Sequence, residues 1–258
     1  MKYCVLASGS KGNMTYIETD QVRIFIDAGI SYKEMKRRMP VNVDQIDAIF
    51  ITHEHGDHMS GLITIANKTH AVVYMSEETH EVYIRRYKEK TADIPVRLIE
   101  ANRKYTIADL QFFTLKLSHD VNSCFGYIIA HQKKSLAYVT DTGFLPLPYI
   151  ELLKKVDHLI IEANHDIIML NESDRSWDLK QRILSVRGHM SNYICGQIIN
   201  TISQEQRLKT VVLAHLSEEC NTEELAVDTV IAAIKGDYIP HIQVAKQYEA
   251  LELTEIIP

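Results

Sequence analysis

The sequence lacks long hydrophobic runs and any paired spacing of cysteines. Among its 258 residues there is no stretch of about 18 apolar residues, so a transmembrane helix is not expected. The four cysteines are scattered, which argues against a disulfide framework or a zinc ribbon and favours a reducing compartment. The first residues, MKYCVLASGSKGN, are interrupted by Gly and polar residues too early for a signal peptide and are typical of a first strand. We therefore expect a cytoplasmic protein without a membrane segment.

The sequence also has fewer basic than acidic residues, 28 Lys and Arg against 34 Asp and Glu. The net charge of −6 argues against broad electrostatic coating of nucleic acid, which needs a positive face, although it leaves room for a local basic patch. The chain contains no obvious repeat, no low-complexity tract and no Pro/Ser-rich linker. We expect one domain that spans residues 1–258.

Strand-like runs dominate the first half of the chain, and longer helices alternate with strands in the second half. The early strand-like runs lie at 3–8, 14–19, 22–29, 48–52, 71–75, 96–100, 105–119, 124–131 and 135–143, with partial alternation of apolar and polar residues. Helices are expected at 32–39, after Asp57, and at 147–156, 176–186, 191–202 and 222–235. Further strand-like runs lie at 158–164, 210–217 and 242–253. This pattern predicts an α/β fold with two sheets packed face to face between helical layers.

The segment THEHGDH, residues 52–58, gathers three histidines and an aspartate directly after a strand-like run. His53 and His55 are two residues apart, so in an extended segment both rings point to one side. Asp57 and His58 follow at a turn assisted by Gly56, where a helix can begin. Imidazole and carboxylate ligands of this kind suit Zn, Mn or Fe. A chance run of surface histidines is the alternative.

Three later residues favour the metal site over that alternative. His119, Asp141 and His215 each follow a strand-like run, where the ends of the sheets are expected to meet. Each of them alone is more readily interpreted as a structural histidine or a turn aspartate. Together with the cluster at 53–58, they predict a dinuclear metal centre.

The order H-x-H-x-D-H followed by single His, Asp and His residues resembles the metallo-β-lactamase fold superfamily. Within it, the chain is most similar to the YycJ/WalJ-like group of metallo-hydrolases. The stretches that carry the resemblance are LASGSKGNMTYIET, IDAGIS, THEHGDHMSGL, LSHD, YVTDTG, EANHD, RGHMSN and AHLSEECN. The resemblance implies a four-layer αββα sandwich with the metals in a cleft at one edge of the paired sheets. Because this fold hosts many chemistries, function must be argued from the site.

The resemblance also implies a ligand set for two divalent metal ions, Zn or Mn, with Fe as a further candidate. The first ion would be held by His53, His55 and His119. The second would be held by Asp57, His58 and His215, and Asp141 would bridge the two. Such a pair of ions supplies a bridging hydroxide that attacks a phosphoryl or carbonyl centre. Asp57 is in addition expected to orient the attacking water. Asp27 and Asp120 are candidates for fixing the histidine tautomers, or are simply turn residues.

His189, in RGHMSN, is the most informative residue outside the ligand set. In phosphodiesterase branches of the superfamily, a non-ligand histidine in this interval contacts the scissile phosphate. A histidine suits that role because its ordinary pKa lies near neutrality. The alternative is a surface histidine near a helix cap.

Four weaker candidates for substrate binding are Asn13, Asn164, His165 and Arg187. Asn13 closes the loop SGSKGN, which offers backbone N–H groups for an oxyanion but is equally consistent with a tight turn. Asn164 and His165 follow a strand-like run and either border the cleft or form a capped turn. Arg187, with Arg182, precedes His189 and either forms a phosphate-contacting patch or lies on a solvated helix face.

The resemblance implies a cytoplasmic DNA exonuclease linked to DNA repair. The interval between Asp141 and His215 lacks the large insertion found in other nucleases of this fold, and homo-oligomerisation is one way to supply the missing groove. Two alternatives remain. One is hydrolysis of a small molecule, either a cyclic phosphodiester, a thioester or a lactone. The other is a non-catalytic, metal-stabilised binding module.

Overall fold

The computed structural model describes residues 1–42, 45–88 and 93–257. The chain divides into two compact units. Unit 1 comprises Met1–Lys116, Val121–Phe125 and Lys246–Glu255, and unit 2 comprises Leu117–Asp120, Gly126–Ala245 and the residues from Ile256 onward. The expectation of one domain over residues 1–258 stays a prediction.

Unit 1 is built on a seven-stranded sheet in the part of the chain that is described. Its strands, in spatial order, are β14 (Thr254–Glu255), β1 (Lys2–Ala7), β2 (Met14–Glu18), β3 (Arg23–Ile26), β4 (Ala48–Phe50), β5 (Val72–Met75) and β6 (Val96–Leu98). Neighbours from β14 to β3 are antiparallel, whereas β3 to β6 are parallel. A hairpin of β7 (Lys104–Ile107) and β8 (Leu110–Leu117) also belongs largely to this unit.

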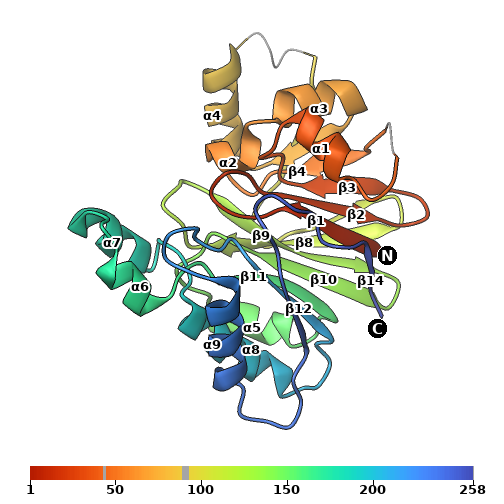
Figure 1. The fold of residues 1–258 in the computed structure, drawn as a ribbon. Coiled ribbons are helices and arrows are strands. Elements are labelled where there is room, and N and C mark those ends of the chain that lie inside the picture. The colour runs from red at the N-terminus through yellow and green to blue at the C-terminus, as the bar shows by residue number, and fades with distance from the viewer. Residues whose placement is uncertain (43–44, 89–92, 258) are drawn as a thin grey trace. The chain divides into compact units, whose positions relative to one another are not determined.

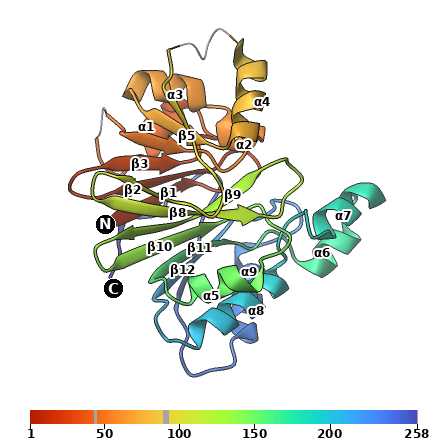
Figure 2. The same cartoon turned by 180° about the vertical axis from the view of Figure 1, so that it is seen from behind.

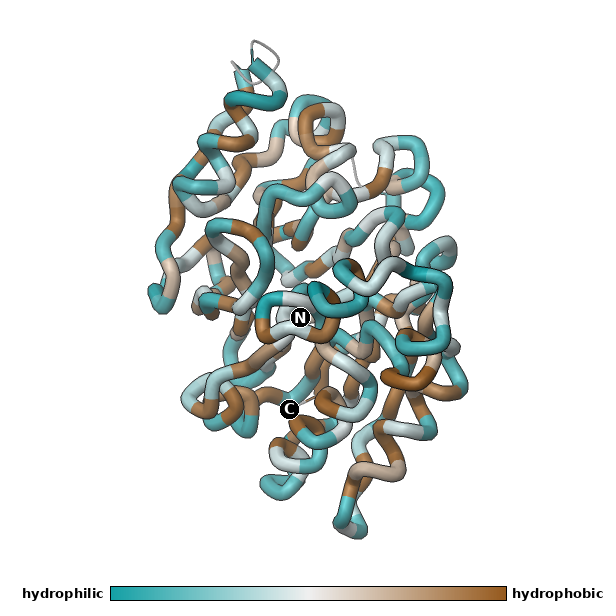
Figure 3. Tube along the Cα trace, turned by 90° about the vertical axis from the view of Figure 1, so that its left-hand side faces the viewer, coloured by the Kyte–Doolittle hydropathy of each residue, from teal (hydrophilic) through white to brown (hydrophobic). Residues whose placement is uncertain are grey.

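The parallel strands of unit 1 are joined by helical crossovers, as parallel pairing requires. These helices are α1 (Tyr32–Arg38), α2 (Gly56–Met59), α3 (Leu62–Thr69) and α4 (Glu77–Tyr87), and they gather on one face of the sheet (Figure 1). Ser31 and Ser76 cap α1 and α4 by accepting a hydrogen bond from the backbone N–H three residues later, the usual way to satisfy a helix start. In Figure 3 the helical segments carry both hydrophilic and hydrophobic bands, the pattern of amphipathic helices that cover a sheet.

The core of unit 1 is aliphatic and aromatic. Every residue of β4 is buried. Phe50 of β4 stacks on Tyr74 with ring centroids 4.9 Å apart and meets Phe112 edge-on at 4.3 Å. These contacts hold β4 in place, and the histidine cluster begins three residues after Phe50.

Unit 2 also combines antiparallel and parallel strands with covering helices. Its strand order is β9 (Cys124–His131), β10 (Lys134–Val139), β11 (His158–Glu162), β12 (Thr210–Ala214) and β13 (His241–Val244). The β9–β10 pair is antiparallel, and β10 to β13 are parallel. All five residues of β11 and of β12 are buried, as expected for central parallel strands covered by helices.

Five helices accompany these strands in the described part of unit 2. They are α5 (Leu147–Leu153), α6 (Ile167–Glu172), α7 (Trp177–Leu184), α8 (Asn192–Ser203) and α9 (Glu223–Ala233). Gly196 of α8 faces α9, and a Cβ at this position would lie 2.7 Å from Cβ of Ala233. The absence of a side chain therefore lets α8 and α9 pack closely. Helices α6 and α7 extend beyond the strand ends, at the side of the unit (Figure 2).

The predicted mixed α/β fold with two sheets and covering helices is confirmed. Several details were wrong or missing, among them α4 and β14, which were not expected as elements. The run at 105–119 is two strands, because the chain turns at Ala108, where φ is +51°. The run at 242–253 is a strand only as far as Val244. Helix α6 was not expected as an element; it starts because the Asp166 side chain accepts hydrogen bonds from the N–H groups of Ile168 and Met169. None of the described helices is long and apolar enough to cross a membrane.

We predict that Phe50→Ala lowers the free energy of unfolding by about 3–5 kcal/mol, because it empties a tightly packed aromatic site. The matched control is Phe144→Ala, since the Phe144 side chain is 51% exposed and its removal leaves no buried cavity. Urea unfolding of both variants measures the difference. Equal losses in the two variants would contradict the packing described for β4.

We also predict a loss of stability in mild acid that originates at His158. Burial lowers the pKa of His158 from 6.5 to about 4, against a smaller opposite effect of Asp157. Between these pH values the unfolded chain takes up a proton that the native protein does not, so stability falls as the pH falls. The slope from this group reaches about 1.4 kcal/mol per pH unit.

Urea unfolding of the wild type and of His158→Gln from pH 7 to pH 4 tests this origin. The variant should show the shallower dependence, because its side chain takes up no proton. His241→Gln, at an exposed position of β13, two strands away from β11, is the control and should keep the wild-type slope. A His158→Gln slope equal to that of the wild type would contradict the assignment.

Candidate metal centre

The residues predicted to bind metal lie at the carboxyl ends of strands in both units. In unit 1, the cluster from His53 to His58 follows β4. In unit 2, Asp141 follows β10 and His215 follows β12, while His119 follows β8. Carboxyl ends of parallel strands are where open α/β sheets place their ligand sites.

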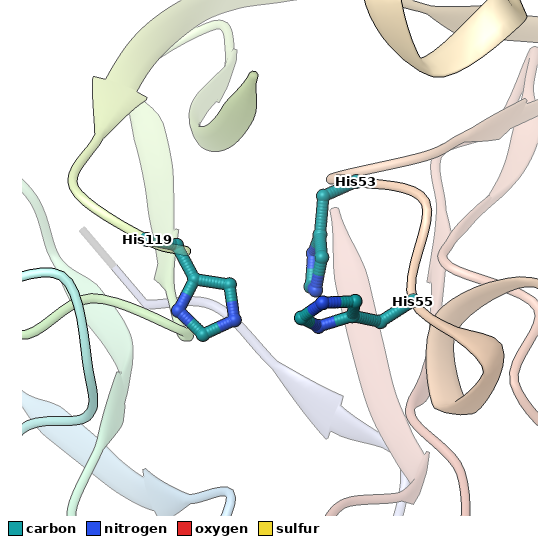
Figure 4. Close-up of side chains that lie close together, drawn as sticks. All are labelled: His53, His55 and His119. Atoms are coloured by element: carbon teal, nitrogen blue, oxygen red, sulfur yellow. The ribbon is translucent and has the colours of Figure 1, made fainter. Parts of the chain in front are cut away.

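The histidines of unit 1 form a compact cluster. The ring of His53 lies 4.7 Å from that of His55 and 4.1 Å from that of His58, measured between centroids. Figure 4 shows His53 and His55 on the loop after β4, and also His119, which belongs to unit 2. Asp57 adds a carboxylate, with its Oδ2 3.4 Å from Nε2 of His58. The unit thus brings together the four residues that the sequence singled out.

The fully buried carboxylate of Asp27 orients the histidines of this cluster. Asp27 follows β3, and its Oδ2 accepts a hydrogen bond from Nδ1 of His58 at 2.7 Å. Its Oδ1 accepts one from the backbone N–H of Thr52 at 2.8 Å, and the Thr52 hydroxyl is 3.0 Å from both oxygens. The same hydroxyl lies 3.0 Å from Nδ1 of His53. Burial raises the pKa of Asp27, and His58 and Thr52 offset part of that effect.

Asp57 is held by a close approach of three backbone segments. Its carbonyl oxygen accepts from the N–H of Asn13 at 2.7 Å, and the carbonyl of Asn13 accepts from the N–H of Gly29 at 2.9 Å. A Cβ at position 29 would lie 1.7 Å from the carbonyl oxygen of Asp57, so only glycine fits there. The Asn13 amide donates to the carbonyl of Gly9 at 3.0 Å and to Oδ2 of Asp57 at 3.2 Å.

In unit 2, Asp141 lies between two of the predicted ligands. Its Oδ1 is 3.4 Å from Nε2 of His215 and 3.9 Å from Nε2 of His119. Nδ1 of His119 donates to the carbonyl of Gly188 at 3.2 Å. The resemblance implies a bridging role for Asp141, and that role stays a prediction.

Glu162, the last residue of β11, organises the histidines of unit 2. Its Oε1 accepts from Nδ1 of His189 at 2.7 Å and from Nδ1 of His215 at 3.0 Å. Its Oε2 accepts from the backbone N–H groups of Thr142 and Met190, both at 3.0 Å. Four donors therefore converge on one carboxylate that has no exposed surface.

The four donors around Glu162 determine the charge of its carboxylate. Burial by itself raises the pKa of Glu162, but the charges and hydrogen bonds of His189 and His215 outweigh it and hold the pKa well below its ordinary value. Burial by itself lowers the pKa of His189, yet Glu162 raises it above the usual range. Glu162 is close enough to Asp141, His189 and His215 to be counted among potential ligands. Its acceptor positions are taken by donors, however, so we assign Glu162 the role of orienting His189 and His215 and not of binding metal.

Three of the site residues have left-handed backbone conformations. The φ angles are +60° at Asp27, +57° at Asp141 and +55° at His215. Such conformations are uncommon outside glycine and cost of order 1 kcal/mol or more each. They turn the chain sharply at the strand ends, which directs each side chain toward its site partners.

The donor atoms present fit divalent metal ions. In His58, His119 and His215, Nδ1 is directed at a carboxylate or carbonyl oxygen, so Nδ1 carries the proton and Nε2 presents its lone pair. This is the usual state of metal-binding histidine. Nδ1 of His53 lies against the Thr52 hydroxyl. Because that hydroxyl donates its own proton to Asp27, Nδ1 of His53 is the donor and Nε2 again presents its lone pair.

The four weaker candidates for substrate binding contact other protein groups or are buried. The side chains of Asn13 and His165 are buried. Asn164 donates to the carbonyl of His215 at 2.8 Å, and Arg187 donates to the carbonyl of His119 at 3.0 Å. These contacts support neighbouring site residues; direct substrate contacts of these four residues stay a prediction. Burial lowers the pKa of His165 to about 4.

Sequence reasoning missed Glu162 and Thr52. A signal for Glu162 was present, because a charged residue ends the otherwise apolar run HLIIE, and a fully buried carboxylate needs donors. Asp27 was singled out and contacts His58 as described. Asp120 lies 3.2 Å from Nε2 of His119 and also pairs with Arg182, so it faces the nitrogen opposite the one that donates to Gly188.

Comparisons with known proteins agree with this geometry. Residues 22–215 match the family model described as the beta-lactamase superfamily domain. The chain belongs to the metallo-β-lactamase superfamily. It is 35% identical to the exodeoxyribonuclease WalJ of Streptococcus pneumoniae, over 89% of this chain and 87% of that protein. It is 32% identical to the exodeoxyribonuclease YycJ of Bacillus anthracis, over 88% of this chain and 86% of that protein.

A solved structure shows the same fold at low sequence identity. The metallo-β-lactamase fold protein YhfI of Bacillus subtilis superposes with a TM-score of 0.74 at 16% identity, covering 97% of this chain and 99% of that one. The predicted superfamily, its YycJ/WalJ-like group and the metallo-β-lactamase fold are therefore confirmed. Within this superfamily the chain is a metal-dependent hydrolase, as the sequence predicts.

We predict that Glu162→Gln weakens metal binding about 10- to 100-fold, the usual effect of losing an outer partner of a ligand histidine. The amide cannot accept from four donors, so His215 loses its fixed orientation. Competition with a chromophoric chelator measures the affinity. Glu151→Gln is the control, because Glu151 forms an exposed pair with Lys154. Equal affinities of the two variants would contradict the role given to Glu162.

Proposed function

We propose that this protein is a metal-dependent phosphodiesterase that removes nucleotides from the ends of DNA. Two observations support the proposal. Relatives that share about a third of its residues over most of both chains are exodeoxyribonucleases. The His/Asp donor set, in which buried carboxylates fix the tautomers of His58 and His215, is suited to divalent ions that activate water.

The proposed ligands are those named from the sequence. His53, His55 and His119 would hold one ion, Asp57, His58 and His215 a second, and Asp141 both. When bound, two divalent ions lower the pKa of a water molecule towards neutrality and offset negative charge on phosphoryl oxygens. Zn and Mn are the proposed metals, because imidazole and carboxylate ligands suit both.

The chain's own residues position the reacting groups. Asn13 and Gly29 fix Asp57, which we propose accepts a hydrogen bond from the attacking water. Asp27 keeps His58, and Glu162 keeps His215, in the tautomer that presents Nε2. His189 is the residue we assign to the scissile phosphate. Its side chain is 23% exposed while Nδ1 is bound to Glu162, so its other ring edge is directed away from the carboxylate and can donate to a phosphate or leaving oxygen.

The protein is proposed to work in the cytoplasm and to take part in DNA repair. Its net charge of −6 requires that contact with DNA be local, or that a homo-oligomer supply a longer surface. Both the location and the role in repair follow only if the protein has nuclease activity.

The decisive experiment is nuclease activity on end-labelled single- and double-stranded DNA and on RNA. Chelated protein is assayed before and after Mn or Zn is added back, with bis-p-nitrophenyl phosphate in parallel. We expect metal-dependent, stepwise loss of nucleotides from a DNA end, and no activity in His55→Ala or Asp57→Asn. Turnover of the small ester alone would indicate a small-molecule phosphodiesterase. No turnover of any phosphodiester would leave thioester or lactone hydrolysis, or the binding module.

We further predict that His189→Ala lowers kcat on DNA by about 10²–10⁴-fold, the usual contribution of a positioned acid or hydrogen-bond donor. Metal content should be retained, because His189 is not in the proposed ligand set. Single-turnover kinetics and metal analysis of the purified variant give both quantities. A fully active His189→Ala, alongside an inactive His55→Ala, would remove His189 from the mechanism.

A further inference from the structure

Unit 2 contains a cavity of about 150 Å³ beside His119 and His189. One wall is the face of α7 that carries Leu179, Arg182 and Ile183. These positions are spaced i, i+3 and i+4, so the three side chains share one side of the helix. The remaining lining comes from loops at the strand ends, with side chains or backbone of Asp120, Asn164, Arg175, Gly188 and Ser217. The cavity therefore adjoins the residues already assigned to the reaction.

Arg175, in the loop between α6 and α7, supplies a positive charge to this cavity. Its Nε donates to Oε2 of Glu219 at 2.9 Å, and a terminal nitrogen lies 3.4 Å from the Ser217 hydroxyl. The side chain of Arg175 is 24% exposed, but that of Glu219 is 69% exposed. An ion pair with so exposed a carboxylate is worth little. An anionic ligand can therefore replace Glu219 at small cost.

Arg182 is placed differently, because its charge already has a partner in the cavity wall. Its Nε and a terminal nitrogen both contact Oδ2 of Asp120, in the geometry of a charge-assisted pair. Asp120 in turn faces His119. Arg187, the arginine that the sequence favoured, donates to the carbonyl of His119 and is not among the residues that line the cavity. Arg175 is thus the arginine whose present partner is easiest to exchange.

We propose that this cavity binds a second phosphate group of the nucleic-acid substrate, next to the phosphodiester that is cleaved, with Arg175 as its main contact. The inference rests on the proposed nuclease function. A guanidinium matches a phosphate through two parallel N–H···O bonds. Ser217 lies beside Arg175 and offers a hydroxyl, and Leu179 and Ile183 offer apolar contact for the attached sugar or base. The cavity therefore favours substrates with at least two consecutive phosphates over isolated diesters.

The test compares Arg175→Ala with the wild type on two substrates. For a DNA oligonucleotide we expect KM to rise about 10- to 100-fold, the value of a hydrogen-bonded contact to a charged group. For bis-p-nitrophenyl phosphate, which has a single phosphate, kcat/KM should not change. Arg175→Lys keeps the charge but loses the two parallel N–H donors of the guanidinium, so its KM should lie between those of the wild type and Arg175→Ala. Arg103→Ala is the matched control, because Arg103 forms an exposed pair with Glu100 in unit 1.

A binding readout independent of turnover accompanies the kinetics. Affinity for a fluorescent phosphorothioate oligonucleotide that resists hydrolysis is measured against salt concentration for the metal-loaded protein. The slope of log affinity against log salt should become shallower by about 0.7 in Arg175→Ala, as expected for one lost contact to a single strand. Arg103→Ala should keep the wild-type slope.

Three results would overturn the inference. One is an Arg175→Ala variant that matches the wild type on the oligonucleotide. Another is an equal loss on both substrates, which would mean that Arg175 supports the metal centre and not a second phosphate. The last is a wild type that neither binds nor cleaves DNA, which would remove the proposed function itself and is recognised without any variant.

Discussion

The candidate centre of unit 2 depends on one buried carboxylate. Removing an ionised side chain from water costs several kcal/mol even after the protein relaxes around it. Glu162 offsets that cost with four donors, two of which are the imidazoles of His189 and His215. The same bonds fix which nitrogen of each ring carries the proton. A group that is expensive to bury therefore sets the direction in which two functional histidines point, and the strand that ends at Glu162 is correspondingly buried along its whole length.

In unit 1, a different buried carboxylate orients the histidines. Asp27, at the end of a neighbouring parallel strand, binds His58 directly and reaches His53 through the hydroxyl of Thr52. In both units the orienting carboxylate is fully buried, and the residues that present metal-binding atoms come from strand ends. The left-handed backbone at Asp27, Asp141 and His215 is strain that the surrounding hydrogen bonds hold in place. The donor atoms of each unit are thus oriented by the protein itself, which is what a precise metal site requires.

Much of this could be predicted from the sequence, and what could not has physical causes. The ligand cluster was visible because four metal-binding side chains within six residues, directly after a strand, seldom occur together outside a metal site. The alternating strands and helices indicated the fold class for a similar reason, since periodicity is a local property. Glu162 and Thr52 escaped notice because their roles depend on partners far apart in the chain, such as Met190 for Glu162. Arg187 was singled out for its closeness to His189 in the sequence, and its contact with substrate stays a prediction. Arg175 could not be singled out in this way, because the fold brings it to the cavity from a different loop.

A long-range ¹H–¹⁵N NMR spectrum of the histidine side chains, recorded with and without zinc, is the most direct test of this orientation by buried carboxylates. Without metal, we predict that Nδ1 is protonated in His58, His119 and His215, because each donates to a carboxylate or carbonyl. On addition of zinc, the Nε2 resonances of these residues should shift while Nδ1 keeps its proton. Protons on Nε2 of His58 or His215 in the metal-free protein, or zinc-induced shifts at Nδ1 of these two rings, would show that the buried carboxylates do not prepare them for metal and would contradict the roles given to Asp27 and Glu162.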